Sequence, residues 1–294
     1  MAIDMTTVKQ IMHGNKEVAK IEDSLGNILW QKPSTTAYRK LKSMGWWCTS
    51  TTAADQYKGW QIPLDFSFPE AYGDEIWIAT QWYKNQIRYA HLVSNYHNNT
   101  TESNFFINVN QNGNNCPSLG YSDGNHNVSY TVKDLSNAIW NSNISTEQAS
   151  VIATYHTGTT QYAAKRNGAA NNNYTCDTDF SSTLGNYGST TLSYMLSTNP
   201  PKSSYYNTCL FAAPQFIGQN TDRHWRGKFY RMEIKDANGA LKHRFYPAQR
   251  KSDNRIGVYD DITNTFYPEV NNCNYNNYNL QIGAVVDENP TGWL

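Results

Sequence analysis

The sequence predicts an all-β protein, in which a two-sheet β-sandwich follows a small N-terminal β-meander. Short segments that alternate apolar and polar residues recur along the chain, which is the pattern of half-buried strands. Gly- and Asn-rich turns separate these segments at short intervals, as they do in sandwiches and barrels. At 294 residues, the chain is long enough for one large domain with a small appendage.

The N-terminal residues are predicted to form a module of their own. Its three strands are expected at 7–12, 17–21 and 28–31. A sheet of this size, about 25 residues, cannot bury enough surface to be stable alone, so it must dock on the main domain, another copy or a larger assembly. Pro33 and the small polar residues after it indicate a linker. We therefore assign residues 1–33 to an attachment or oligomerisation module and residues 34–294 to the sandwich with a short C-terminal extension. Alternatively, the first segment adds strands to the main domain.

The main domain contains a series of alternating segments that we predict as strands. Before residue 220 these are 38–44, 59–68, 75–82, 86–92, 105–109, 128–132, 149–156, 191–196 and 209–216. Later in the chain, 228–235 is followed by turn residues 236–239, where Asn and Gly tolerate positive φ. The next strand is predicted to end at Pro247, because proline has no N–H for a ladder. The last two predicted strands are 256–260 and 265–267.

The same C-terminal half carries a specific motif, GKFYRMEIKDANGALKHRFYPAQRKSDNRIGVYDDITNTFY, at residues 227–267. This run resembles the C-terminal half of the concanavalin A-like, LamG-type jelly-roll domains found in bacteriophage tail and other virion proteins. The resemblance implies a jelly-roll sandwich, a fold that hosts lectins, hydrolases and inert scaffolds alike. The matching residues are Gly227, Lys228, Tyr230, Ile234, Phe245, Pro247, Lys251, Ser252, Asp253, Ile256, Gly257, Tyr259, Asp260, Phe266 and Tyr267.

A second motif, VKQIMHGNKEVAKIEDSLGNILW, lies at residues 8–30. It resembles a short N-terminal module common on tail-associated proteins of phages that infect low-GC Gram-positive bacteria. The resemblance implies a virion protein that is made in the host cytoplasm and attached to other virion proteins through its first 33 residues. The N-terminus lacks the cationic and apolar parts of a signal peptide, and no apolar run approaches the roughly 18 residues of a membrane span. Both observations agree with release by lysis.

The composition favours contact with neutral, hydroxyl-rich ligands. Lys plus Arg equals Asp plus Glu at 24 each, so no net field attracts nucleic acid or an anionic membrane. Charged residues make up only 16%, while the chain has 21 Tyr and 9 Trp and is rich in Asn. Neutral hydrogen-bonding groups and flat amphipathic rings suit sugars. A mutational bias toward AT-rich codons would give the same composition.

Metal and disulfide chemistry is not indicated by any compact motif. The cysteines form neither a C-x-x-C pair nor a His–Cys cluster, so we expect free, buried thiols in a reducing cytoplasm. The five are Cys48, Cys116, Cys176, Cys209 and Cys273. We expect no cofactor, with Ca²⁺ as the one cation to consider. Asp253–Asn254 and Asp260–Asp261 offer hard oxygen ligands, although turns favour Asp and Asn for backbone reasons alone.

No catalytic residues are expected. Retaining glucanases of the fold that the chain resembles place two carboxylates on one strand face, at the spacing that glycoside hydrolysis needs. The nearest match, residues 233–236, has Lys235 between its acids, and Asp74 and Glu75 face opposite ways on a strand. Six of the seven histidines lie on separate segments of the main domain without a nucleophile signature: His91, His97, His126, His156, His224 and His243.

Aromatic residues are the predicted ligand contacts, because flat rings can stack on sugar rings. Successive strand residues point to opposite faces, so one residue of each adjacent aromatic pair is expected to face away from the core. Two tyrosines in an Asn-rich loop tip would bind either glycan or a neighbouring subunit. The candidate glycan contacts are Trp46, Trp47, Trp82, Tyr83, Tyr275 and Tyr278. Trp60 and Trp77 are expected in the core, and Trp293 is expected to contact a partner.

Together these observations favour a non-enzymatic phage virion structural protein that displays a lectin-like domain for tail- or fibre-associated adhesion to host-surface glycan. One alternative is a capsid decoration or head-fibre protein. Another is a polysaccharide depolymerase, against which the missing carboxylate pair argues. A homo-oligomer is expected, and trimers are frequent on fibres. We expect no nucleic-acid binding and no membrane insertion.

Overall fold

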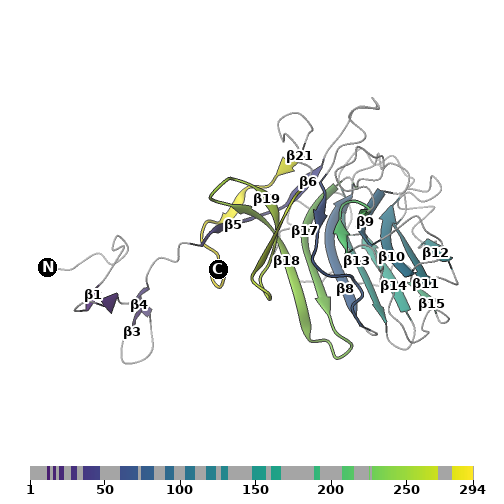
Figure 1. Cartoon of the computed structure of the whole chain (residues 1–294), viewed down its shortest axis with the longest axis horizontal. Coiled ribbons are helices and arrows are strands. Elements are labelled where there is room, and N and C mark those ends of the chain that lie inside the picture. Colours follow the sequence, from purple (N-terminus) through teal and green to yellow (C-terminus); the bar gives the residue numbers. More distant parts are fainter. Residues whose placement is uncertain are drawn as a thin grey trace.

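The predicted all-β sandwich is confirmed by a computed structural model, in which two antiparallel sheets pack face to face (Figure 1). The described residues contain no α-helix. The structure describes residues 12–13, 16–17, 20–22, 28–31, 36–46, 60–71, 74–82, 90–95, 103–109, 117–123, 127–131, 148–156, 160–166, 189–192, 207–214, 225, 227–270 and 280–293. Side chains are described at 21, 36–45, 60–71, 74–80, 91–95, 105, 107, 207–214, 225, 227–270 and 282–293.

The larger sheet has twelve strands, eight of them in the order β15-β14-β13-β8-β17-β18-β19-β20. Two short pairs are inserted beside β17 and β18: β6 pairs with β17 and β21, and β5 pairs with β18 and β22. The strands are β5 (Tyr38–Leu41), β6 (Met44–Trp46), β8 (Glu75–Trp82), β13 (Gln148–His156), β14 (Thr160–Arg166), β15 (Ser189–Leu192), β17 (Gly227–Lys235), β18 (Leu241–Arg250), β19 (Ile256–Asp260), β20 (Thr265–Pro268), β21 (Leu280–Ile282) and β22 (Val285–Asp287).

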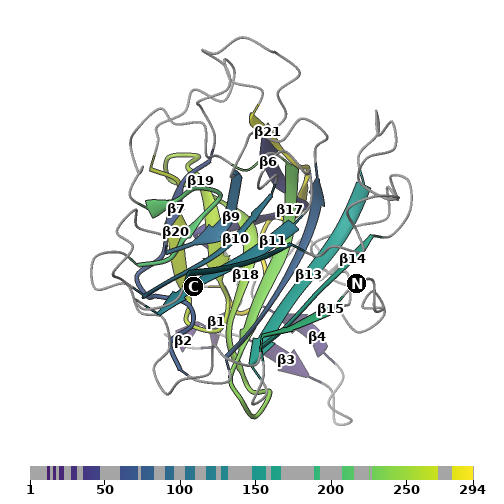
Figure 2. The same cartoon turned by 90° about the vertical axis from the view of Figure 1, so that its right-hand side faces the viewer.

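The smaller sheet lies in front of the larger one in Figure 2 and has the order β12-β11-β10-β9-β16-β7. Its strands are β7 (Ile62–Pro63), β9 (Ala90–Ser94), β10 (Ser103–Val109), β11 (Pro117–Asp123), β12 (Asn127–Thr131) and β16 (Cys209–Leu210). Apolar side chains from the facing sides of both sheets form one core cluster, which includes Ile78, Met232 and Phe245 from one sheet and Leu92 and Ile107 from the other. Burial of each such side chain contributes about 1.5–3 kcal/mol.

The C-terminal motif folds largely as predicted. In β17 the predicted alternation is present, since Met232 and Ile234 are buried and the charged residues that alternate with them, Arg231, Glu233 and Lys235, are half-buried. The pairing of β17 with β8 shifts between Phe229 and Arg231, and both Phe229 and Tyr230 are buried at this bulge. The turn after β17 is also confirmed, and Gly239 has φ +81°, which glycine adopts without a steric penalty.

Pro247 does not end its strand, because β18 continues to Arg250. On one side, Pro247 pairs with Val258 of β19. On the other side, described pairing with β17 ends at Phe245 and pairing with β5 begins at Ala248. No described strand therefore needs an N–H from residue 247 on that side, and the proline is tolerated inside the strand.

Several other predicted segments have different bounds in the structure. The segment 38–44 is two strands, separated where Lys42 N–H donates to the Ala284 carbonyl and Gly283 N–H donates to the Ser43 carbonyl. Only Ile62–Pro63 of the predicted strand 59–68 is a strand, because the following residues bond to Thr208 instead of a ladder. Strands β11 and β14, which are rich in polar and small residues, were missed in the sequence.

The described part of the N-terminal segment forms two hairpins that lie apart from the sandwich (Figure 1). They are β1 (Met12–His13) with β2 (Lys16–Glu17), and β3 (Lys20–Glu22) with β4 (Ile28–Gln31). The predicted first strand lies mostly outside the described residues. The assignment of these residues to an attachment module stays a prediction.

Trp293, which was expected to contact a partner, packs within its own chain. Its ring stacks on Tyr259 with 4.3 Å between centroids, in a small cluster that includes Tyr246 and Tyr38. The segment before it is fastened by an ion pair of 2.8 Å between Arg39 and Glu288. The C-terminal extension therefore covers aromatic residues of β18 and β19 with its own tryptophan.

Two further expectations concern single residues of the described core. Cys209 is a buried free thiol, and burial raises its pKa to about 12. Trp60 is 1% exposed, as predicted for a core residue, whereas Trp77 is half-buried. The part of the chain that the structure describes includes no helix with the length and apolarity that a membrane span requires.

Candidate functional site

Two of the predicted glycan contacts lie in one row across the larger sheet. Gly227, the first residue of β17, pairs with Trp46 on one side and with Trp82 on the other. Leu280, the first residue of β21, pairs with Trp46 from its outer side. We call the row Leu280, Trp46, Gly227 and Trp82 the aromatic row.

The aromatic row lies where the core ends and four strands meet their loops. The preceding row, two residues further into the sandwich, contains Met44, Phe229 and Thr80, which pair across the same three strands. All three are at most 1% exposed. Strands β6 and β8 end at the aromatic row, and β17 and β21 begin there. Segments far apart in the sequence thus converge at one end of the sheet.

The other four predicted contacts lie outside the described residues. These are Trp47, Tyr83, Tyr275 and Tyr278. In the sequence, Trp47 and Tyr83 directly follow the two tryptophans of the row, and Tyr278 precedes Leu280 by two residues. Three of the four therefore belong to chain segments that enter or leave the aromatic row.

Glycines allow the strands to approach closely beside the row. Gly45 pairs with Lys228 of β17 and with Gln281 of β21. A Cβ at position 45 would lie 2.2 Å from the Gly227 carbonyl oxygen, which is far inside contact distance. Only glycine fits at this position without moving a backbone, so the separation of β6 and β17 depends on it.

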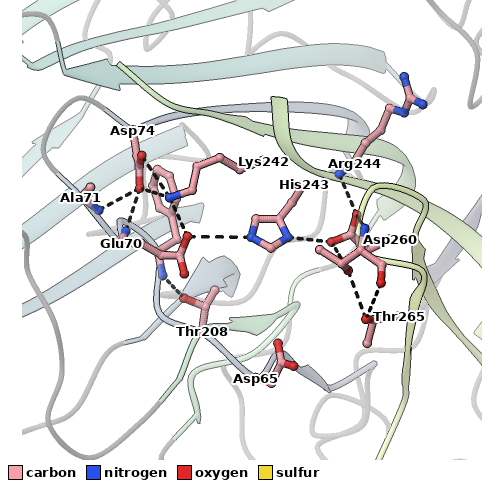
Figure 3. A network of polar contacts seen from close by, with 12 residues as sticks. Asp65, Glu70, Ala71, Asp74, Thr208, Lys242, His243, Arg244, Asp260 and Thr265 are labelled. Atoms are coloured by element: carbon pink, nitrogen blue, oxygen red, sulfur yellow. Dashed lines mark hydrogen bonds and ion pairs between the residues drawn. The ribbon is translucent and has the colours of Figure 1, made fainter. Parts of the chain in front are cut away.

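A second cluster of functional groups, centred on His243, joins three distant segments (Figure 3). His243 lies in β18, and its Nδ1 is 2.6 Å from Asp260 Oδ2 at the end of β19. Its Nε2 is 3.8 Å from Glu70 Oε2, in the loop between β7 and β8. Phe66 of the same loop stacks on the imidazole with 4.2 Å between centroids. The imidazole thus holds the loop to β18 and β19.

Asp260 is fully buried and is bound from several directions. Its Oδ1 accepts hydrogen bonds from the N–H groups of Arg244 and Ile262, and its Oδ2 accepts one from the Thr263 hydroxyl. Burial works to raise the pKa of Asp260, but the hydrogen bonds from His243 and these donors outweigh it and hold the pKa below its usual value.

The loop end of the cluster is an ion-pair network around Lys242. Its Nζ lies 2.6 Å from Glu70 Oε2 and 3.1 Å from Asp74 Oδ2. Partial burial works to lower the pKa of Lys242, but hydrogen bonds to both carboxylates raise it. Asp74 Oδ2 also accepts the N–H groups of Glu70 and Ala71, so this carboxylate shapes the loop as well.

The acidic side chains of this cluster all have protein partners. Glu70, Asp74 and Asp260 each bind a cationic or N–H partner. The acids of the 233–236 segment are engaged too, since Glu233 lies 3.7 Å from Lys235 Nζ and Asp236 accepts two backbone N–H groups of its turn. His243 is hydrogen-bonded to Asp260 through Nδ1, and its Nε2 faces Glu70.

The calcium candidates have protein partners as well. Asp253 binds Arg250 at 2.6 Å, and this hydrogen bond, with one from the Arg255 N–H, lowers the pKa of Asp253 to about 2. Asp261 forms a bidentate ion pair with Arg244. Within the described ranges, no group of three or more His, Cys, Asp or Glu side chains is placed to hold a metal ion.

This chain resembles several solved structures in its fold, with low sequence identity and low TM-scores. No family model matches the sequence, and no curated protein matches it. Domains LG4-5 of the mouse laminin alpha1 chain align with a TM-score of 0.36 and 9% identity over 72% of this chain, which spans 44% of that chain. The CBM40 of the Ruminococcus gnavus IT-sialidase, bound to alpha2,6 sialyllactose, aligns with a TM-score of 0.34 and 12% identity, over 68% of this chain and 92% of that chain. The enzymatically active domain of tailspike protein 2 of bacteriophage CBA120 aligns with a TM-score of 0.33 and 9% identity, over 69% of this chain and 29% of that chain. With TM-scores this low, these structures carry no conclusion about the function of this chain.

Proposed function

We propose that the chain is a non-enzymatic structural protein of a bacteriophage virion, whose β-sandwich binds glycan on the host surface at the aromatic row. The observation that carries the glycan site is the register that places Trp46 and Trp82 on either side of Gly227. The virion assignment is supported by the resemblances of the N-terminal run and the C-terminal motif.

The register places the two tryptophans of the row one strand apart, with Gly227 between them. Neighbouring strands lie about 4.8 Å apart, so the Cα atoms of Trp46 and Trp82 are about 10 Å apart across β17. Gly227 adds no side chain between the two tryptophans of the row. Apolar ring faces with a few polar groups nearby are typical of small-ligand sites.

The absence of catalysis is supported by the state of the described acids. The carboxylates of the His243 cluster and of the 233–236 segment are occupied by cations and N–H groups. Hydrolysis of a glycoside needs one carboxyl to donate a proton and a second to act as nucleophile or base. Binding without turnover is therefore the function that these residues support.

A glycan array tests the binding proposal. Purified wild-type protein is expected to bind a subset of printed pyranose oligosaccharides, and Trp46→Ala and Trp82→Ala are each expected to weaken binding about 10-fold or more, since aromatic stacking contributes about 1–3 kcal/mol. Trp77→Ala, at the other end of β8, is the matched control and should bind normally. Retained binding by both row variants, or no binding by the wild type to any glycan, would contradict the proposal.

Cryo-electron microscopy of the intact particle tests the virion assignment. Density for the sandwich at a tail tip or fibre, with residues 1–33 against another virion protein or a symmetry mate, is the expected result. Density spread over the head lattice would make the chain a capsid decoration or head-fibre protein instead. Particles without the protein would contradict the assignment.

A further inference from the structure

A buried tryptophan links the smaller sheet to the strand that carries Trp46. Trp60 lies two residues before β7 and is 1% exposed. Its indole Nε1–H donates a hydrogen bond of 2.6 Å to the carbonyl oxygen of Gly45 in β6. The contact is buried and joins residues 15 positions apart in the sequence, across the two layers of the sandwich.

The bonded carbonyl belongs to the same peptide plane as the backbone N–H of Trp46. A peptide unit is planar, so the Gly45 carbonyl and the N and Cα atoms of Trp46 move as one rigid group. A donor that fixes the direction of this carbonyl therefore also fixes the direction in which the chain enters Trp46.

The backbone of Gly45 is closely held by its neighbours. It is paired on both edges, and it lies so close to Gly227 that no Cβ fits between them. With the indole bond in place, the peptide is held by β17, by β21 and from the core side by Trp60. Without that bond, the Gly45 carbonyl loses a buried hydrogen-bond donor, and the direction of the Gly45–Trp46 peptide is set by strand pairing alone.

We infer that Trp60 is a positioning residue for the glycan site, because it holds the Gly45–Trp46 peptide in place beside Gly227. The inference rests on the proposed function, since it concerns the same site. Trp60 does not touch the ligand and acts through the backbone of β6. A displacement of about 1 Å at a binding group can remove much of its contribution, as is known for catalytic groups.

Two variants separate positioning from general stability. Replacement of Trp60 with 3-benzothienylalanine exchanges the indole N–H for sulfur and keeps the ring shape, and Trp60→Phe is the simpler alternative. The same replacement at Trp77 is the matched control. We expect the benzothienyl variant at position 60 to speed amide hydrogen exchange of Trp46 and of residues 280–282 about 10-fold or more. Amides of β18 and β19 should keep wild-type rates.

Glycan affinity is measured on the same variants, with the array oligosaccharide that the wild type binds best as the probe. The benzothienyl variant at position 60 is expected to lose affinity about fivefold or more, and the variant at position 77 none. Exchange that rises uniformly, or not at all at Trp46, would overturn the positioning role whether or not glycan binds. Selective exchange with unchanged affinity would also overturn it. Failure of the wild type to bind any glycan would instead reject the proposed function, while the exchange result still reports on the Trp60 contact.

Discussion

At the scale of single residues, Gly257 shows how the C-terminal motif encodes close packing. The residue lies in β19 and pairs with Ala248 of β18 and Pro268 of β20. A Cβ at this position would lie 2.1 Å from the Tyr267 carbonyl oxygen and 2.9 Å from the Pro268 Cα. Both are backbone atoms of the neighbouring strand, which cannot turn aside as a side chain can. Gly257, one of the residues that match the C-terminal motif, therefore lies at a close approach of two strands.

Replacement of this glycine should destabilise the sandwich. We expect Gly257→Val to lower the free energy of unfolding by about 1–3 kcal/mol, or more if β20 detaches, because overpacking forces backbone shifts. Urea denaturation of the purified protein measures the effect. Gly239→Asn is the control, because no atom lies within 4 Å of a Cβ there and Asn tolerates the positive φ of that turn. A Gly257→Val protein as stable as the wild type would show that the strand approach is not tight.

At the scale of elements, strand bounds are predicted best where apolar and polar residues alternate. They are predicted worst where the pairing with neighbouring strands determines them. The bounds of β8 and β19 match the predicted segments. In β8 the alternation reflects burial, since Ile76 and Ile78 are buried and Trp77 between them is half-buried. The end of β18 could not be predicted from Pro247, because tolerance of a proline depends on which neighbour needs its N–H. That information lies in the register of β17 and β5.

The candidate sites show the same division. Trp46 and Trp82 were singled out as residue types, but only the register brings them to opposite sides of Gly227. The His243 cluster was missed, because its members lie in segments around residues 70, 243 and 260 with no common motif. From the sequence, the Asp260–Asp261 pair is considered only as a source of oxygen ligands for a metal ion. In the structure, Asp260 instead accepts a hydrogen bond from the Ile262 N–H in the turn that follows it.

Asp260 should make the attachment of the 260–264 turn to β18 depend on pH. We expect Asp260→Asn to lower the free energy of unfolding by about 1–3 kcal/mol at pH 7, since it replaces a buried carboxylate that accepts several hydrogen bonds. The pKa of Asp260 is lowered by folding, so its contribution is present above the ordinary aspartate pKa and is lost as pH falls through the folded-state pKa. The difference between variant and wild type should therefore be constant from pH 7 to 5 and shrink below about pH 4.

Urea denaturation at several pH values measures this dependence. Asp253→Asn is the control, because Asp253 forms its ion pair at the surface, where such pairs contribute little. A difference between Asp260→Asn and wild type that stays the same down to pH 3 would show that the carboxylate charge is not what stabilises the turn.

At the scale of the whole molecule, the proposed function divides two tasks, ligand display and attachment, between the sandwich and the N-terminal segment. The sandwich has its own core, and its aromatic row gathers segments from both halves of the sequence at one end of the larger sheet. The two N-terminal hairpins lie apart from it (Figure 1) and are too short to be stable without a partner. This division fits a display domain carried by an attachment module.

Deletion of residues 1–33 should separate these tasks. We expect the truncated protein to keep the melting temperature of the sandwich, because every described member of the core cluster lies after residue 40. Incorporation into the particle should be lost, which immunoblotting of purified virions would detect. The full-length protein, expressed from the same vector, is the control. Normal incorporation of the truncated protein would reject the attachment role, and loss of the folded sandwich would show that the segment belongs to the main domain.

The most direct test of the central claim is to record the indole N–H signals of the nine tryptophans by NMR during titration with the oligosaccharide that binds best on the array. Each signal can be assigned by a single substitution to phenylalanine. If the aromatic row is the binding site, the signals of Trp46 and Trp82 shift first and saturate together, while those of Trp77 and Trp225 stay in place. If the Trp77 or Trp225 signals shift and those of Trp46 and Trp82 do not, the glycan binds elsewhere and the account of the site is wrong.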